Sequence, residues 1–377
     1  MCKGSFIANG FIMFSPSATL RTIQNAPPTS AQIEARLIDC VRVLCITFMM
    51  FTHLKEYEQS SVYGGDLNIL GVLTNDYLGR ASVPALSLIS GYLLVLGWKK
   101  IDAPDLRKFT IRKTNRVIVP MLTWNLIYIL TVAAAYFTIN YQHRVIEIIQ
   151  DGSFIDIVNA FTSLTSSPAN FTLHFIRDLF VTQILIFGIL SLCGRYRIPI
   201  LIAFGGYALI AQMEPIISRE LIVVFLVAGA LMALYGVRLI SLASSRAVLV
   251  VCLAMLAVLI AWGPQPRINV SSYTFFDLFM RIGISLSIIV VSFYLAHLSI
   301  WKVFRFLAPV SFLTYLLHLP VTSMLWALWS KVYPSNDGLA YVAYYFLAPL
   351  LAWSIAITLS TGLNKRPALA SVLGLKE

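Results

Sequence analysis

Charge is what this sequence has least of. Asp, Glu, Lys and Arg together make up 12% of its 377 residues, about half the share found in soluble globular domains. Hydrophobic residues make up 58%. A chain with so little charge cannot cover a water-exposed surface, which excludes an intrinsically disordered protein and an ordinary soluble enzyme. The composition predicts a chain built of membrane-spanning segments.

Cysteine and histidine are scarce, and neither is grouped. The five cysteines form no C-x-x-C pair, and no histidine cluster accompanies them. Most of them lie in or beside apolar stretches, where Cys usually behaves as a small buried hydrophobe. The sequence therefore predicts neither a disulfide framework nor a metal site.

Long apolar runs are abundant instead. After a mixed stretch over residues 1–35, about ten apolar segments of roughly 15–24 residues follow, with no long soluble domain between them. They cover residues 37–54, 82–98, 117–139, 173–193, 199–213, 220–237, 247–263, 277–300, 306–329 and 341–363. We expect an all-α polytopic membrane bundle of about ten transmembrane helices over residues 36–363, between cytoplasmic tails at 1–35 and 364–377.

The basic residues fall unevenly between the two sets of loops. With the N-terminus in the cytoplasm, the cytoplasmic segments hold 19 Lys and Arg and the opposite loops hold 6. Cytoplasmic loops of membrane proteins carry such an excess, so the count supports ten spans with both termini inside. The net charge of +11 is then mainly a signal of topology, and we expect no nucleic-acid partner.

Ionisable residues inside the first segment point to a function. Asp39 and Arg42 are three residues apart, so they share a helical face and can pair. His53 lies eleven residues after Arg42, about 16 Å deeper in the membrane and on the same face. Charged and titratable groups within spans are costly and usually functional. The alternative is that Arg42 contacts lipid phosphate and His53 packs at the outer interface.

The ninth segment carries a second buried histidine. Ser311, Tyr315 and His318 are spaced to share one helical face, and His318 lies about 18 Å from the inner end. This depth matches that of His53 on another helix that runs in the same direction. Two imidazoles at one depth predict a site of proton transfer.

Two further groups of residues each allow two interpretations, and a third favours one. Polar residues at the outer ends of two segments would hold a hydroxyl-bearing acceptor or form buried ion pairs; they are His174, Arg177 and Asp178 on one segment, with Asp277 and Arg281 on the other. Arg112 and Arg116 share a helical face that suits phosphate oxygens, although a topological anchor explains most of the nearby charge. Ser90 and Gly91 are typical of helix packing through small residues.

These motifs together resemble the acyltransferase 3 family of integral-membrane O-acyltransferases, which includes bacterial polysaccharide O-acetylases. The family's first helix carries an Arg, ten residues and a His, and this chain has "IDCVRVLCITFMMFTH". The likeness covers about residues 36–363. Its other parts are Ser90-Gly91-Tyr92 in place of Ser-Gly-Phe, "RKTNRVIVP", "LHFIRDLFV" without the family's Trp, and "SFLTYLLHLPV".

The resemblance implies acyl transfer, usually of acetyl, from cytoplasmic acyl-CoA to a sugar hydroxyl. Acyl-CoA is then a co-substrate, and no cofactor is permanently bound. Under this interpretation His53 is the general base, and His318 and Tyr315 orient groups or stabilise charge. The donor would be held by Arg42, Arg112, Arg116, Ser90 and Gly91, with Asp39 as the partner of Arg42. The glycan would be contacted by His174, Arg177, Asp178 and Arg281.

The resemblance also implies a setting. The acceptor would be a glycan or lipid-linked glycan, the location a bacterial inner membrane, and possible partners the proteins of polysaccharide assembly. A transporter or flippase of a lipid-linked glycan would show many spans and buried charges too, although we see no duplicated halves of the kind that transporters often have. A sensor or scaffold without chemistry is a third interpretation.

Overall fold

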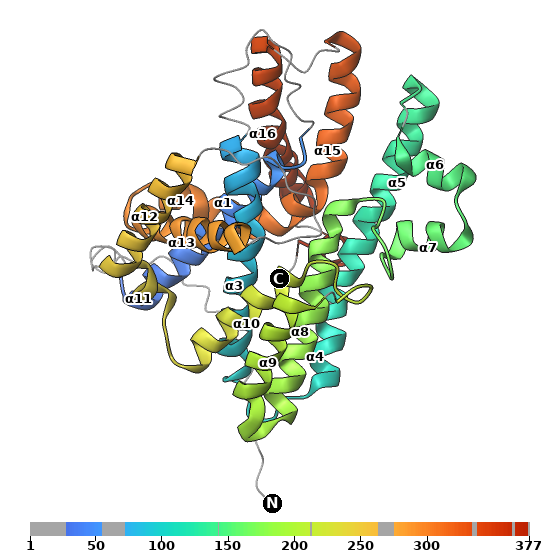
Figure 1. Cartoon of the computed structure of the whole chain (residues 1–377). Coiled ribbons are helices and arrows are strands. Elements are labelled where there is room, and N and C mark those ends of the chain that lie inside the picture. Colours follow the sequence, from blue (N-terminus) through green and yellow to red (C-terminus); the bar gives the residue numbers. More distant parts are fainter. Residues whose placement is uncertain are drawn as a thin grey trace, which may run out of the picture.

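The computed structural model describes residues 28–54, 72–141, 143–211, 213–262, 275–333, 338–363 and 366–375 (Figure 1). Most of the predicted N-terminal tail, and residues 364–365 and 376–377, lie outside these ranges. The described residues form helices and connecting turns, without a β-strand among them. The α-helices are α1 (Ser30–Phe51), α3 (Arg80–Trp98), α4 (Leu106–Lys113), α5 (Val119–Ile139), α6 (Arg144–Asp151), α7 (Phe154–Thr162), α8 (His174–Leu192), α9 (Arg197–Ile210), α10 (Glu220–Leu234), α11 (Leu239–Ala243), α12 (Arg246–Trp262), α13 (Phe275–His297), α14 (Trp301–Leu307), α15 (Ser311–Val332), α16 (Gly338–Leu363) and α17 (Pro367–Val372).

Short π- and 3₁₀-helical segments extend several of these helices. The π segments η3 (Val72–Gly79) and η4 (Thr114–Ile118) lead into α3 and α5. The 3₁₀ segments are η5 (Phe171–Leu173), η6 (Gly194–Tyr196) and η7 (Ala308–Val310). Each of these segments joins the α-helix next to it into one continuous helical stretch. The stretches that contain α3, α5, α8 and α15 are therefore longer than those helices alone.

Six continuous helical stretches among the described residues are long and apolar enough to cross a membrane. They are Leu73–Trp98, Leu106–Ile139, Phe171–Leu192, Asp277–His297, Trp301–Val332 and Ala340–Leu363. The expected helical class is confirmed, and the chain is an integral-membrane protein by these helices. The expected count of about ten is not confirmed.

The remaining four predicted segments are helical, but each is short or charged. They correspond to α1, α9, α10 and α12. Helix α1 carries four charged residues within nine positions, from Glu34 to Arg42. Helix α9 has 14 residues and rises about 21 Å, less than a hydrocarbon core of about 30 Å. Apolar composition located these helices, whereas their ends depend on local turns that composition does not reveal.

A close crossing of α3 and α10 lies at the centre of the bundle. A Cβ atom added to Gly91 would lie 1.9 Å from the carbonyl oxygen of Leu226, and one added to Gly229 would lie 1.9 Å from that of Leu88. Only glycine fits at such points, because any side chain would overlap the opposite backbone. Gly91 is therefore a packing residue, as one of its two predicted interpretations required.

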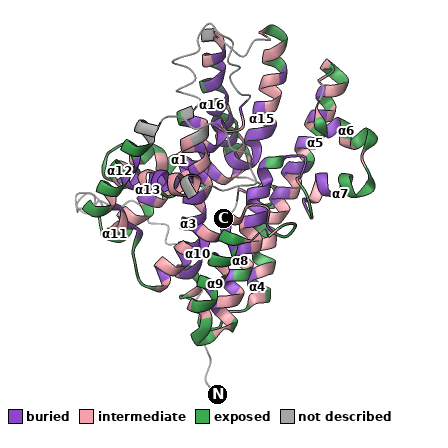
Figure 2. Ribbon diagram, in the orientation of Figure 1, coloured by how far each residue is buried: buried purple, intermediate pink, exposed green. Residues whose placement is uncertain are grey.

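Around this crossing, the helices divide into groups. Helices α15 and α16 pack together and rise side by side at the top of Figure 1, while α5 with α6 and α7 lies on the right. Buried residues concentrate on α1, α3, α8, α10 and α15 (Figure 2). Large apolar side chains such as Phe137, Phe154 and Ile210 are exposed on the periphery. In a membrane protein such side chains face lipid, and the polar residues of the interior are the ones that need an explanation.

Candidate active site

Helix α1 ends just before its histidine. The hydroxyl of Thr52 donates to the carbonyl of Met49 at 2.7 Å, and the backbone N–H of His53 donates to Met50 at 3.1 Å. These short-range bonds tighten the last turn and replace the regular helical pattern. The expectation that Arg42 and His53 lie on one uninterrupted helix is wrong, because His53 lies in the turn that follows α1.

His53 nevertheless meets His318, as their depths predict. The two ring centroids are 5.4 Å apart and the ring planes are inclined by 36°. Phe171, which begins η5 before α8, packs edge-on against His53 at 5.2 Å. His318 is buried near the middle of the apolar helix α15, whereas His53 is half-buried. The two imidazoles, one in the turn after α1 and the other on α15, thus lie in contact, and their role in proton transfer stays a prediction.

The hydrogen bond of His318 fixes its tautomer. Its Nδ1 atom contacts the backbone carbonyl of Tyr315. A carbonyl oxygen only accepts, so Nδ1 must donate, and in a neutral imidazole Nε2 then carries a lone pair. Nε2 is buried and has no hydrogen-bond partner among the described residues. His318 therefore carries an acceptor nitrogen that no other described residue uses, on a ring that lies beside His53.

Tyr315 connects the histidine pair to the start of α8. Its hydroxyl donates to the backbone carbonyl of Thr172 in η5, and its ring lies 5.5 Å from that of His318. His174, at the first position of α8, is buried, and its Nε2 atom also lacks a partner within the described residues. Buried polar atoms are almost always hydrogen-bonded in folded proteins, so these two imidazole nitrogens, without a partner in the described residues, are available to hydrogen-bond another molecule.

The side chains of Arg177 and Asp178, in contrast, are hydrogen-bonded to the protein. Asp178 is fully buried, and one of its carboxylate oxygens accepts from Nε of Arg177 at 3.0 Å and from its second terminal nitrogen at 2.8 Å. The other oxygen accepts the backbone N–H groups of Ser218 at 3.1 Å and Arg219 at 3.0 Å. Arg177 further donates to the carbonyl of Ser163 at 2.8 Å and to the hydroxyl of Ser218. We call these five residues, together with their bonds, the closed ion-pair cluster.

The closed ion-pair cluster ties three parts of the chain together. Ser163 follows α7 with a left-handed backbone (φ 58), Arg177 and Asp178 belong to α8, and Ser218 and Arg219 precede α10. Of the two interpretations of Arg177 and Asp178, this geometry favours the buried ion pair, because the carboxylate and guanidinium spend their bonds on the protein. Contact with a glycan stays a prediction for both residues.

Arg219 was missed in the sequence analysis. From the sequence, Arg219 is only one of the 6 basic residues assigned to the outer loops. The structure places its half-buried side chain where its charge interacts electrostatically with the imidazoles of His53 and His174 and with the hydroxyl of Tyr315. The sequence does contain a feature that singles it out. Only 6 basic residues are assigned to the outer loops, and Arg219 directly precedes an apolar segment.

The residues predicted to hold the donor lie on separate elements. Arg112, in the last turn of α4, and Arg116, in η4, are both exposed. Asp105 is the N-cap of α4. Its side chain accepts a hydrogen bond from the backbone N–H of Lys108, and this bond lowers the pKa of the carboxyl. Asp39 and Arg42 are half-buried on α1. The two exposed arginines are open to a soluble anion.

Two other predicted site residues lie within helix contacts. Ser90 is half-buried on α3, directly before the packing residue Gly91. Arg281 on α13 donates from Nε to Asp277 at 2.7 Å and from a terminal nitrogen to the carbonyl of Arg80 at 3.3 Å. These bonds join α13 to the start of α3, so Arg281 has a structural partner on each helix.

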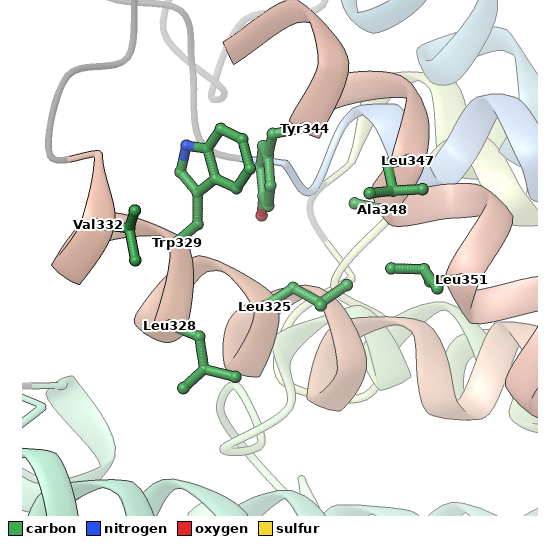
Figure 3. Close-up of a pocket in the computed structure, with 8 residues that line it drawn as sticks. All are labelled: Leu325, Leu328, Trp329, Val332, Tyr344, Leu347, Ala348 and Leu351. Atoms are coloured by element: carbon green, nitrogen blue, oxygen red, sulfur yellow. The ribbon is translucent and has the colours of Figure 1, made fainter. Parts of the chain in front are cut away.

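A separate apolar pocket of about 290 Å³ lies between α15 and α16 (Figure 3). Trp329 and Tyr344 lie next to each other in the upper part of that view, with their ring centroids 5.5 Å apart. The lining consists of Leu325, Leu328, Trp329, Val332, Tyr344, Leu347, Ala348 and Leu351. The hydroxyl of Tyr344 is already bonded to the carbonyl of Thr322. Leu325 is two helical turns beyond His318, about 10 Å along α15. The pocket lacks the groups needed for proton transfer, so the candidate chemistry lies at the histidines.

Comparison with known proteins agrees with the motifs. Residues 36–359 match the family model of acyltransferase 3, described as an acyltransferase domain. The chain is also 28% identical, over 367 residues, to the succinoglycan biosynthesis protein ExoH of Rhizobium meliloti (strain 1021). That alignment covers 91% of this chain and 92% of the relative. No solved structure matches the chain. The matched region includes both His53 and His318 and favours an enzyme over a transporter.

Proposed function

This chain belongs to the acyltransferase 3 family and is a membrane O-acyltransferase, and from this premise we propose that it moves an acyl group from cytoplasmic acyl-CoA to a hydroxyl of an exported polysaccharide. The acyl group we propose first is acetyl. The observation that carries the proposal is the contact between His53 and His318 within the helical bundle, with ring centroids 5.4 Å apart.

The proposed reaction uses the histidines for proton transfer. His53 removes the proton of the acceptor hydroxyl as its oxygen attacks the thioester carbonyl. The carbon–sulfur bond then breaks, and the proton passes to the leaving thiolate of CoA. The free Nε2 atom of His318 is available to accept a hydrogen bond from His53 or from the acceptor hydroxyl. General-base catalysis of this kind contributes about 10²–10⁴-fold to the rate.

The proposed donor site lies at the cytoplasmic side. There, Arg42, Arg112 and Arg116 bind the phosphates of CoA, and the pantetheine arm extends between helices toward His53. The exposure of Arg112 and Arg116 supports this proposal, since guanidinium groups bind phosphate oxygens bidentately. The orientation, with both termini in the cytoplasm, rests on the 19 basic residues assigned to that side against 6 on the other.

The proposed acceptor is an exported polysaccharide or its lipid-linked precursor. The printed name of the relative, a succinoglycan biosynthesis protein, supports a glycan acceptor and the setting of a bacterial inner membrane. The glycan would approach from the outer side, near His174 and the start of α8, and proteins of polysaccharide assembly would deliver it.

Purified protein in lipid nanodiscs, incubated with labelled acetyl-CoA and extracted surface glycan, tests the proposal. We expect label on the glycan and release of free CoA. An Arg112→Gln/Arg116→Gln double variant should raise KM for acetyl-CoA about tenfold or more, as expected when charged hydrogen bonds worth about 1.5–3 kcal/mol each are lost. Its KM for an acetylated pantetheine without phosphates should stay unchanged.

The matched control is Arg107→Gln. Arg107 is exposed on α4 but five residues from Arg112, and so on a different face of the helix. It should leave both KM values unchanged. Glycan that gains no label from acetyl-CoA or from other acyl-CoA donors would refute the proposed reaction, and an equal effect of Arg107→Gln would refute the assigned phosphate site.

A further inference from the structure

The backbone of Arg219 is held in place by a fully buried carboxylate. The N–H of Arg219 donates to Asp178 at 3.0 Å, and the N–H of Ser218 donates to the same oxygen at 3.1 Å. Asp178 itself is fixed by the side chain of Arg177. The turn before α10 is therefore anchored to α8, and the origin of the Arg219 side chain has one defined position.

That position is next to the histidine site. Asp178 lies one helical turn after His174. In η5, which precedes α8, the backbone carbonyl of Thr172 accepts a hydrogen bond from the hydroxyl of Tyr315. Tyr315 in turn contacts His318, which contacts His53. The positive charge of Arg219 interacts electrostatically with groups on three separate elements, namely His53, His174 and Tyr315. The charge of Arg219 is thus near enough to the histidine site to act on it.

The guanidinium of Arg219 differs from that of Arg177 in what it binds. Within the described part of the chain it makes no hydrogen bond and no ion pair, although it is half-buried. Its charge is attracted by the buried carboxylate of Asp178, but the hydrogen bonds of that carboxylate come from Arg177 and from two backbone N–H groups. The guanidinium of Arg219 therefore keeps hydrogen-bond donors with which to bind another anion. The free Nε2 atoms of His174 and His318 belong to the same surroundings.

We propose that Arg219 is a catalytic residue that stabilises the oxyanion formed on the acyl carbonyl, an inference that rests on the proposed acyl transfer. When the acceptor oxygen bonds to the carbonyl carbon, the C=O electron pair moves to its oxygen, which becomes negative and binds the guanidinium. As the carbon–oxygen double bond re-forms, the carbon–sulfur bond breaks and thiolate leaves. The proton taken from the hydroxyl goes to that thiolate.

Steady-state kinetics of Arg219→Gln in nanodiscs tests this role. Glutamine keeps hydrogen-bond donors but removes the charge. We expect kcat to fall about 10²–10³-fold with KM for acyl-CoA and glycan unchanged, as for loss of one donor to an oxyanion. Arg219→Lys should restore part of the lost rate because it returns the charge. The melting temperatures of both variants should equal that of the wild type, since the backbone of Arg219, rather than its side chain, binds Asp178.

The matched control is Arg144→Gln, which removes an exposed arginine at the start of α6 and should leave kcat unchanged. An Arg219→Gln enzyme with wild-type kcat would overturn the inference and leave the proposed function intact. A rise in KM without a change in kcat would also overturn it, because the charge would then serve binding alone. Wild-type protein that transfers no acyl group would overturn the proposed function and the inference together.

Discussion

Two polar regions lie close together at the start of α8, and they differ in how their bonds are used. In the closed ion-pair cluster, both oxygens of Asp178 accept two hydrogen bonds each. In the histidine site, His318 and His174 each keep a buried ring nitrogen without a partner among the described residues. The side chains of Arg177, Asp178, His174 and His318 are all buried, so the contrast between them lies in their hydrogen-bond partners and not in their exposure.

The difference separates structure from function. A buried charge is tolerable when every bond is made, and the closed ion-pair cluster meets that condition by joining α7, α8 and the turn before α10. Unmade bonds cost free energy, so a folded chain keeps them where a ligand will make them. The sequence motif "HFIRD" places both kinds of residue on adjacent turns, and only their partners distinguish them.

Substitution of His53 should give the largest effect. We expect His53→Ala to lower acyl transfer about 10²–10⁴-fold, because the general base is lost. The melting temperature in detergent should be close to that of the wild type, since the residue lies in a turn after α1. Labelled-acetyl transfer and thermal unfolding measure the two quantities. His297→Ala, at the exposed end of α13, is the control. A His53→Ala enzyme with wild-type activity would show that the histidine site, like the closed ion-pair cluster, serves the structure and not the reaction.

Opening the closed ion-pair cluster should affect stability first. Asp178→Asn leaves the guanidinium of Arg177 buried without its counter-charge, and we expect a loss of about 3–5 kcal/mol in unfolding free energy. Thermal unfolding in detergent measures it. Asp277→Asn, in the half-buried pair with Arg281, should cost less because both partners are partly exposed. Equal melting temperatures for Asp178→Asn and the wild type would contradict the structural role.

Two glycines on α3 test whether Gly91 serves helix packing or the binding of the acyl donor. Gly91→Ala should cost about 1–3 kcal/mol of unfolding free energy, because its Cβ would overlap the carbonyl of Leu226. Gly97→Ala on the same helix, with nothing within 4 Å of the added atom, should be neutral or slightly stabilising. KM for acyl-CoA should stay unchanged in both. A raised KM with an unchanged melting temperature would restore Gly91 to the donor site.

Much of the architecture followed from local patterns. Apolar runs located helices at each predicted segment, and residue counts along two of them placed His53 and His318 at one depth. What local patterns missed were the ends of helices. The hydroxyl of Thr52, bonded to Met49, ends α1 before His53, and α9 stops at 14 residues. Such ends depend on single hydrogen bonds, which average composition does not register.

The sequence by itself determined the helical class, the family and the depth of the two imidazoles, because hydropathy and helical rise are properties of neighbouring residues. Only the tertiary structure decided which arginine side chain is hydrogen-bonded within the described residues and which is not. The partners of Arg177 and Asp178 include Ser218 and Arg219, which lie about 40 residues further along the chain. Folding brings these groups within hydrogen-bond distance, and their bonds fix the closed ion-pair cluster, while the charge of Arg219 acts on His53 and His174.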